Sequence, residues 1–338
     1  MNNLPTDAPQ APIADREAAE KARSLYLNQE PREGRDTTAA VMTSFNKIKD
    51  VRLNLDAIRR QTIKFDEVIV VDNHSNDGTQ EMIRGDFPEV HFIEMPNSSY
   101  GACETFNIGF GNATTKFVAI LDDDIVMPEE WVEKMLAKFR TEPDTTGFIS
   151  SRVVEPEMPD WYKEHPTVNT ERYMSTFRGC ATMARRDVLK SAGYYDVRFF
   201  IYGNERDLSC RILNLGFRIL QYPTLVVQHG TPFGMKKGPR SLYYHVRNLW
   251  LYMFKNVGWG AIFGFVFSMA TKPFRKKKND GEITADAVGS IGGMSLISDT
   301  PGGLWICIKA TLNAICLLPY CLKNRRVCTH EDSSLPTH

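Results

Sequence analysis

The chain has 338 residues, of which 42% are apolar and 24% are charged, so it can bury at least one large hydrophobic core. Lysine plus arginine and aspartate plus glutamate balance at 41 each, so the basic excess that favours nucleic-acid binding is missing. The seven cysteines include no Cys-x-x-Cys pair, so we expect neither a zinc site nor a disulfide framework. A cytoplasmic protein is the simplest interpretation, since residues 1–10 do not resemble a secretory signal.

The first half of the chain predicts an alternation of strands and helices. Residues 1–35 are polar and carry four prolines, and we expect a disordered or loosely helical tail there. Apolar runs and helical patterns then alternate from residue 36 to residue 150. This alternation predicts an α/β fold with a mainly parallel sheet and helices on both faces. The four strands are expected at 38–43, 68–71, 90–94 and 117–121.

The pattern becomes less regular between residues 151 and 256. We expect helices at 204–216 and 241–256, from their apolar residues at helical spacing. The strands are expected at 173–183, 217–220 and 225–228. We therefore treat residues 36–256 as one domain with two halves, 36–150 and 151–256.

The last part of the chain, residues 257–338, predicts an apolar and basic helical extension. Its apolar stretches, 257–270 and 304–322, adjoin the basic clusters 275–278 and 323–326. Neither stretch offers the roughly 20 uninterrupted apolar residues of a membrane span. Two interpretations stay open, an interfacial membrane anchor and an ordinary C-terminal helix that covers its own core.

Three successive aspartates, Asp122-Asp123-Asp124, end the fourth predicted strand. Adjacent carboxylates repel each other at the end of a buried strand, so they need a cation or an acidic turn open to water. An Asp-x-Asp spacing at the carboxyl end of a strand can hold Mg²⁺ or Mn²⁺ against a phosphate. The triplet therefore favours a metal site, with an acidic turn as the alternative.

Other polar residues are expected at the same edge of the sheet, because ligands of such folds bind at the carboxyl ends of the strands. Thr43 ends the first strand and Asp72 ends the second, where a carboxylate can accept from a ribose hydroxyl or a base N–H. A plain turn is the alternative for Asp72, since Asn, Asp and Gly form turns anyway. The loop 96–101 opens a helix that carries Asn107 and can approach a sugar nucleotide closely.

Two later residues have the chemistry that such a site needs. Glu205 lies in the first turn of a predicted helix, where the positive helix end favours a charged carboxylate that can act as a general base. Asp207 is better explained by an ion pair with Arg211, four residues later. His229 is a lone histidine, usually a structural residue, but beside a metal it can be a third ligand.

The order of these motifs resembles the family 2 glycosyltransferases of the GT-A fold. The resemblance is greatest to the bacterial branch with rhamnosyl- and galactofuranosyl-type transferases, and it covers residues 38–256. The matching motifs are the Thr-Ser-Phe-Asn turn at 43–46, Val-Asp-Asn-His-Ser-Asn-Asp-Gly-Thr at 71–79, Asp-x-Asp at 122–124 and Gly-Tyr-Tyr-Asp at 193–196.

The resemblance implies a GT-A Rossmann-like fold and an inverting, metal-dependent sugar transfer. Residues 36–150 would bind a UDP- or dTDP-linked sugar, and 151–256 a glycan or lipid-linked acceptor at the inner face of the cytoplasmic membrane. Glu205 would be the catalytic base. Mg²⁺ or Mn²⁺ would be held by Asp124 with Asp122 and His229. The residues expected to contact the donor are Thr43, Phe45, Asp72, Asn97, Gly101, Asn107, Asp122 and Asp123.

The chain departs from the family pattern where an acidic Glu-Asp pair is usual, because Asn204-Glu205 stands there. This change leaves open a catalytically inactive sugar-nucleotide-binding protein. A phosphatase of the haloacid-dehalogenase type would fit Asp122-x-Asp124-x-Val126, but it would carry that motif on its first strand. A dehydrogenase is disfavoured because no Gly-x-Gly-x-x-Gly follows the first strand.

Overall fold

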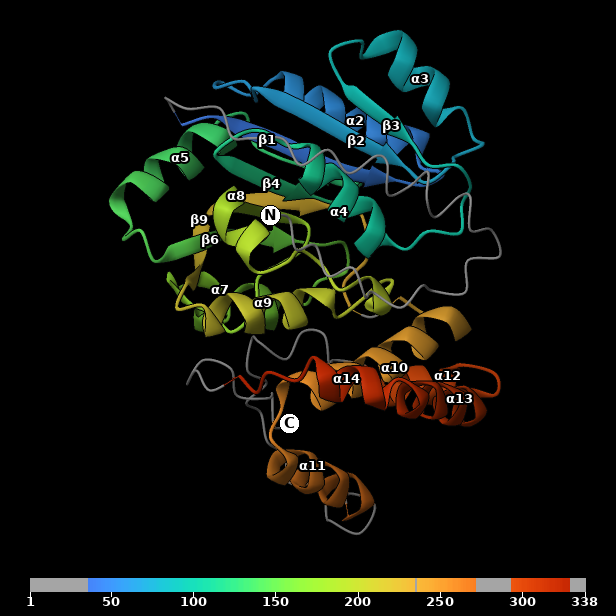
Figure 1. The fold of residues 1–338 in the computed structure, drawn as a ribbon. Coiled ribbons are helices and arrows are strands. Elements are labelled where there is room, and N and C mark those ends of the chain that lie inside the picture. Colours follow the sequence, from blue (N-terminus) through green and yellow to red (C-terminus); the bar gives the residue numbers. More distant parts are fainter. Residues whose placement is uncertain (1–35, 235, 272–292, 329–338) are drawn as a thin grey trace.

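The computed structural model of the chain describes residues 36–234, 236–271 and 293–328. A twisted sheet with helices on both faces forms the body, and a group of helices from the end of the chain lies beyond it (Figure 1). The predicted tail 1–35 and the basic cluster 275–278 lie outside the described residues.

The first half of the sheet is parallel, as the alternating pattern predicts. Its strands are arranged in the order β3-β2-β1-β4, and every neighbouring pair runs parallel. Their bounds are Thr38–Ser44 for β1, Glu67–Asp72 for β2, His91–Glu94 for β3 and Phe117–Leu121 for β4. The helices between them are α2 (Ile48–Arg59), α3 (Thr79–Asp86) and α4 (Ala102–Asn112). The predicted α/β class and the mainly parallel sheet are therefore confirmed.

The second half of the sheet is mixed, and the order continues β4-β8-β6-β9-β5. Strand β8 is antiparallel to both of its neighbours, whereas β6 and β9 are parallel to each other. The bounds are Ile125–Val126 for β5, Thr146–Val154 for β6, Arg172–Tyr173 for β7, Ala181–Arg185 for β8 and Arg218–His229 for β9. The short helices α6 (Asp160–Lys163) and α7 (Pro166–Asn169) lie between β6 and β7, and η1 (Val197–Phe199) precedes α9.

Two predictions for this half were wrong in detail. The strand expected at 173–183 is a loop between β7 and β8, because only its two ends pair with the sheet. The two strands expected at 217–220 and 225–228 are one long strand, β9. Pro223 interrupts the apolar pattern, but β9 continues past it because the register of β9 against β6 shifts between Ser151 and Arg152.

The core forms two apolar layers, one on each face of the sheet. Alternate residues of β1 show this directly, since Ala39 and Val41 join one layer and Ala40 and Met42 join the other. Helices α2, α3 and α5 (Trp131–Thr141) cover the second layer. The first layer is covered by α4, α8 (Arg186–Ser191), α9 (Asn204–Asn214) and α10 (Pro239–Asn256).

The extension contains α11 (Trp259–Thr271), α12 (Gly293–Asp299), α13 (Gly303–Cys316) and α14 (Leu318–Lys323). Helices α13 and α14 pack beside α10 and α12 packs against α13, whereas α11 projects away from them (Figure 1). Ala310 and Ala314 of α13 are fully buried, and the indole of Trp250 on α10 donates to the Thr311 hydroxyl at 3.1 Å. Among the described residues, no helix combines the length and apolar character that crossing a membrane requires.

Candidate active site

Strand pairing brings His229 to the aspartate triplet from more than a hundred residues away. Ile125 of β5 lies opposite His229 of β9 in an antiparallel pair, so the residue before Ile125, Asp124, adjoins the imidazole. Strand β6 runs parallel to β9 and ends with Val154 opposite Gln228. Glu155, the next residue after β6, therefore reaches the other side of the same imidazole.

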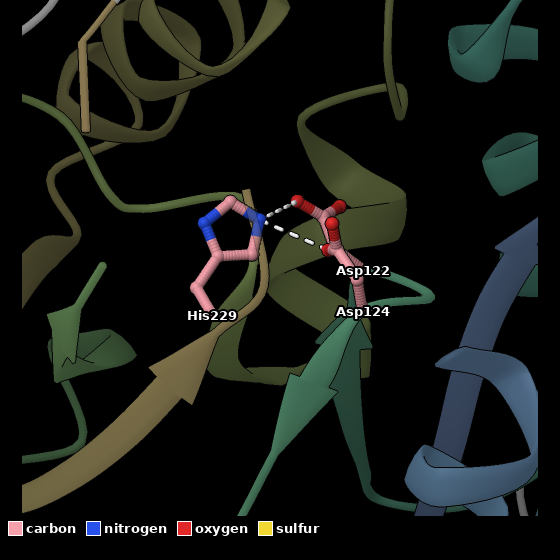
Figure 2. Close-up of side chains that lie close together, drawn as sticks. All are labelled: Asp122, Asp124 and His229. Carbon is pink, nitrogen blue, oxygen red and sulfur yellow. Dashed lines mark ion pairs between the residues drawn. The ribbon is translucent and has the colours of Figure 1, made fainter. Parts of the chain in front are cut away.

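The side chains of Asp122, Asp124 and His229 point toward one another, as Figure 2 shows. The Nε2 atom of His229 lies 3.0 Å from Oδ1 of Asp124 and 3.6 Å from Oδ2 of Asp122. One ligand atom from each of the three residues falls within 4.8 Å of the others, which is compact enough for a single ion. On the far side of the ring, Nδ1 lies 2.9 Å from Oε1 of Glu155.

These residues fit a divalent cation by their donor chemistry. Two carboxylates and an imidazole offer oxygen and nitrogen ligands, a set compatible with Mn²⁺ or Mg²⁺. When neutral, His229 can donate Nδ1–H to Glu155, which leaves the Nε2 lone pair directed at the aspartates. A carboxylate behind a histidine is the usual support of a metal ligand.

Lys47 is a further contact of the triplet that the sequence analysis missed. Its ammonium lies 2.9 Å from Oδ1 of Asp123 and 2.9 Å from Oδ2 of Asp124. The hydroxyl of Thr231 also donates to Oδ2 of Asp124 at 2.8 Å. The signal for Lys47 was its position directly after the 43–46 turn, whereas Thr231 and Glu155 are placed only by strand pairing.

The site holds its carboxylates at unequal pKa values. Burial opposes ionisation of Asp124, but the hydrogen bond from His229 and the charge of Lys47 outweigh it and hold the pKa below its usual range. Desolvation raises the pKa of Asp122, although 39% of its side chain stays exposed and water relieves part of that cost. Burial lowers the pKa of His229, yet hydrogen bonds to Asp124 and Glu155 raise it to about 10. In the metal-free protein His229 is therefore protonated and adds a positive charge to the cluster.

Glu205 is a further carboxylate, near enough for its charge to act on Asp122. It lies in the first turn of α9, and the amide of Asn204 donates to its Oε1 at 3.1 Å. A Cβ at Gly179 would come within 2.6 Å of Oε1, so a larger residue there would displace this carboxylate. Desolvation raises the pKa of Glu205, and its charge in turn contributes to the raised pKa of Asp122.

Asp207, only two residues from Glu205, has a different environment. It is fully buried and contacts the ammonium of Lys255 at 2.7 Å, the guanidinium of Arg211 at 2.9 Å and the amide of Asn256 at 2.9 Å. Burial opposes its ionisation, but the neighbouring cations outweigh that effect and hold its pKa below the usual range. The predicted pair with Arg211 is confirmed. A saturated, inaccessible carboxylate is unsuited to take a proton from a substrate.

Comparison with known sequences identifies the domain that carries this site. The sequence profile described as "Glycosyl transferase family 2" matches residues 39–203. Residues 39–203 are a family 2 glycosyltransferase domain. The match contains the aspartate triplet and ends just before Glu205, so α9, β9 and His229 lie beyond it.

Two curated relatives illustrate the range of the similarity. A pre-mycofactocin glycosyltransferase of Mycobacterium tuberculosis is 26% identical over 241 residues, which are 64% of this chain and 49% of the relative. The chain thus spans about half the length of that relative. An amylovoran biosynthesis glycosyltransferase of Erwinia amylovora is 23% identical over 231 residues, which are 64% of this chain and 85% of the relative.

Solved structures share the fold of the family 2 domain. A mannosyltransferase of Pyrobaculum calidifontis, solved with GDP-Man and Mn²⁺, matches 94% of this chain and 83% of its own with a TM-score of 0.52 and 18% identity. The enzyme GalNAc-T7, solved with UDP, GalNAc and Mn²⁺, matches 79% of this chain and 57% of its own with a TM-score of 0.52 and 16% identity. At these identities the likeness establishes the GT-A fold alone.

Asp72 of the family 2 domain is buried rather than open at the rim. Its Oδ1 accepts from the hydroxyls of Ser44 at 2.7 Å and Ser75 at 2.6 Å, and its Oδ2 accepts from the Ser75 N–H at 2.7 Å and the Gln80 amide at 3.1 Å. The carboxylate therefore fixes the turn after β2, and contact with a nucleotide stays a prediction. Thr43 is partly buried and 43% of Phe45 is exposed, which leaves the Phe45 ring available to a base.

The loop before α4 gives its predicted donor residues mainly structural roles. Asn107 is buried, and its amide makes hydrogen bonds with both the N–H and the carbonyl of Tyr195, so its contact with a donor stays a prediction. A Cβ at Gly101 would lie 2.5 Å from the carbonyl of Phe200, a close approach that requires glycine. The side chain of Asn97 accepts from the N–H and the hydroxyl of Ser99, and its role with a donor stays a prediction.

A cavity of about 340 Å³ adjoins the cluster on the side of α2. Asp124, Glu155 and His229 form part of its wall, and Asp50 and Leu53 of α2 face them. The volume lies at the small end of the range for small-molecule sites. Space therefore reaches the predicted metal ligands from α2 in addition to the open rim.

Proposed function

We propose that this protein is an inverting, metal-dependent glycosyltransferase that moves a sugar from a nucleoside diphosphate to a hydroxyl of a glycan or lipid-linked acceptor. The observation that carries the proposal is the cluster of Asp122, Asp124 and His229 with Glu205 at the same rim. The family 2 domain and the GT-A fold support the class of reaction.

Asp124 and His229 would hold the divalent cation, with Asp122 as the third ligand. When bound, Mg²⁺ or Mn²⁺ supplies stabilisation of the negative charge on the departing nucleoside diphosphate. Glu155 keeps the His229 ring in the orientation that directs Nε2 at the aspartates. Lys47 compensates part of the charge of Asp123 and Asp124.

Glu205 would act as the general base. Its raised pKa makes it a stronger proton acceptor than an exposed glutamate, and no ion pair holds its charge among the described residues. It would take the proton of the acceptor hydroxyl as that oxygen forms a bond to the anomeric carbon. The bond from this carbon to the diphosphate oxygen breaks in the same displacement, so the configuration at that carbon inverts.

The donor is proposed to be a UDP- or dTDP-linked sugar, a hexose or deoxyhexose. The fold neighbours were solved with GDP-Man or UDP, which supports a nucleotide sugar in general. The relative described as an amylovoran biosynthesis glycosyltransferase supports a role in polysaccharide synthesis, which we place at the inner face of the cytoplasmic membrane.

Thermal denaturation with UDP, dTDP and GDP, each with and without Mn²⁺, tests the donor site. We expect one nucleotide to raise the melting temperature only when Mn²⁺ is present, and its sugar conjugate to release nucleoside diphosphate when acceptor is added. A response without any turnover would favour the alternative, an inactive sugar-nucleotide-binding protein. If no nucleotide raises the melting temperature, the proposed donor site is wrong.

A further inference from the structure

Two helices of the extension keep large apolar side chains in water. On α11 the exposed fractions are 42% for Trp259, 69% for Phe263 and 68% for Phe267, three residues spaced by four so that they form one stripe. On α13 the face opposite the buried alanines exposes five apolar residues, with fractions from 41% to 72%. They are Leu304, Trp305, Ile308, Leu312 and Ile315. Two exposed apolar faces of this size are unusual on a protein that meets only water.

The described residues on and after α13 carry charge of one sign. Residues 257–271 have no charged side chain, and residues 301–328 carry four lysines and arginines but no aspartate or glutamate. Two of these cations lie on the apolar aromatic rings themselves. The ammonium of Lys309 lies 5.3 Å from the ring centroid of Trp305, and the guanidinium of Arg325 lies 4.5 Å from that of Trp259.

We propose that the apolar faces of α11 and α13 form a docking surface for an anionic lipid bilayer. Aromatic and aliphatic side chains enter the boundary between headgroups and acyl chains, while lysine and arginine next to them reach the lipid phosphates. The inference rests on the proposed function in one respect, because a lipid-linked acceptor would be presented by that bilayer.

Among the described residues, nothing covers these faces, because their side chains stay 41% to 72% exposed. Residues 272–292, which join α11 to α12, contain five cations, three acids and few large apolar side chains. A second copy of this surface would bring cations against cations, which like-charge repulsion disfavours. A bilayer with anionic headgroups matches both properties, the apolar stripe and its positive border.

Helix α10 contacts both the docking surface and the loop that leads to Glu205. Helix α13 packs along α10 on one side. On α10 the amide of Asn248 donates to the carbonyls of Phe199, Ile201 and Tyr202, in the loop that leads to Glu205. A further ion pair of 3.8 Å joins Lys237, in the loop after His229, to Asp299 at the end of α12. Lipid contact would therefore place the proposed base at a fixed height above the bilayer.

Vesicle flotation of the full chain tests the surface. We expect binding to phosphatidylcholine vesicles with about one third phosphatidylglycerol, weak binding to pure phosphatidylcholine, and a loss of binding at high salt. The double variant Phe263→Glu/Phe267→Glu should lower the partition coefficient by at least about tenfold. Leu215→Glu is the matched control, because Leu215 is 45% exposed at the end of α9, outside the extension, and it should bind like the parent.

A second pair of variants separates charge from apolar contact. Lys309→Gln and Arg326→Gln replace exposed cations, and each should weaken binding to the anionic vesicles by about fivefold without changing the melting temperature. If the parent binds neutral and anionic vesicles equally well, the proposal that the bilayer must carry anionic lipid is wrong. A dimer that forms through Phe263 and Phe267, without vesicle binding, overturns the bilayer in favour of a second copy.

The same preparations are tested for Mn²⁺-dependent nucleotide binding, so the two proposals can fail separately. Absence of vesicle binding with nucleotide binding retained overturns only the docking surface. Vesicle binding without any nucleotide response overturns the proposed transferase and leaves the surface in place.

Discussion

Two groups of carboxylates each have one member in the first turn of α9, and they differ in how their charge is balanced. In the inner group, Asp196 and Asp207 share Lys255 at 2.6 and 2.7 Å, and Asp207 also contacts Arg211 at 2.9 Å. Each acid of this group thus has a cation from its own chain. The group joins α9 to α10 and to the turn before η1, and it needs nothing from outside.

The outer group at the rim has a deficit of positive charge. It contains five carboxylates, whereas among the described residues only Lys47 and His229 lie within ion-pair distance of any of them. These carboxylates are Asp122, Asp123, Asp124, Glu155 and Glu205. This difference distinguishes two kinds of buried acidic group in the fold. A group balanced by its own cations stabilises the structure, and a group in deficit is suited to bind a cation from solution.

The largest effect is expected from removing the central ligand of the outer group. Asp124→Asn keeps the shape but removes the charge that faces His229 and Lys47. Mn²⁺-dependent transfer should fall by about a thousandfold or more, since the metal contributes several kcal/mol to the transition state. Isothermal titration of Mn²⁺ and a transfer assay measure both consequences.

Asp123→Asn is the matched control for this change. Asp123 belongs to the same triplet and contacts Lys47, but it does not belong to the group of three that fits an ion. It should keep most of its Mn²⁺ affinity. If Asp124→Asn and Asp123→Asn lose the same Mn²⁺ affinity, the triplet acts through its total charge and the assignment of Asp124 as a ligand is wrong.

The next largest effect is expected at Glu205. Glu205→Gln should keep donor binding by calorimetry and lose about 10² to 10⁴ in turnover, the contribution of a positioned general base. In the parent, turnover should fall as the pH drops through the pKa of Glu205, because only the charged form accepts a proton. Desolvation raises that pKa, so the fall should begin at a higher pH than an exposed glutamate would give. Full turnover by Glu205→Gln would place the base elsewhere.

The inner group should respond in stability rather than in chemistry. Asp207→Asn leaves Lys255 buried without its full partner and should cost about 3–5 kcal/mol of unfolding free energy. The pKa of Asp207 is lower in the folded state than in the unfolded one, so this stability is present at neutral pH. It is lost as the pH falls below the usual aspartate pKa toward the folded value. Urea unfolding measures both effects, and Mn²⁺ affinity close to that of the parent is the expected control.

The sequence predicted the residues at the carboxyl edge of the sheet better than the side chains that contact them. The apolar run 117–121 and the aspartates after it fixed β4 and its carboxyl end, and the parallel register then brought Asp72 and Asp122 to one edge. These features depend on continuous apolar runs that end in polar residues, which a single sequence displays directly. The predicted combination of Asp122, Asp124 and His229 lies together in the structure as expected from the resemblance.

The remaining contacts depend on long-range pairing that no local pattern encodes. Glu155 adjoins His229 only because β6 and β9 are parallel in one register, and β9 had been divided at Pro223. Asn107 looked available for a ligand, but its amide is used by Tyr195, 88 residues later. The sequence thus shows which residues have useful chemistry, whereas packing decides which of them remain free to use it.

The smallest of these effects is expected at Glu155, and it tests whether the outer group extends behind the metal ligands. Glu155→Ala removes the acceptor 2.9 Å from Nδ1 of His229, so the ring can turn and Nε2 is no longer held toward Asp124. The affinity for Mn²⁺ should fall by about 10 to 100-fold, the usual effect of losing such a support. Calorimetry of the nucleotide-free protein at fixed pH measures it without depending on turnover.

Two further variants decide whether Glu155 acts through orientation. Glu155→Gln keeps a side-chain oxygen for Nδ1–H and should recover part of the affinity, because the hydrogen bond rather than the charge orients the ring. Glu164→Ala changes an exposed glutamate nine residues away and should leave the affinity unchanged. If Glu155→Gln binds as weakly as Glu155→Ala, the negative charge of Glu155 matters more than its geometry. The charge deficit of the outer group would then extend to all five carboxylates, and the contrast with the self-balanced inner group would be greater than the ligand geometry alone indicates.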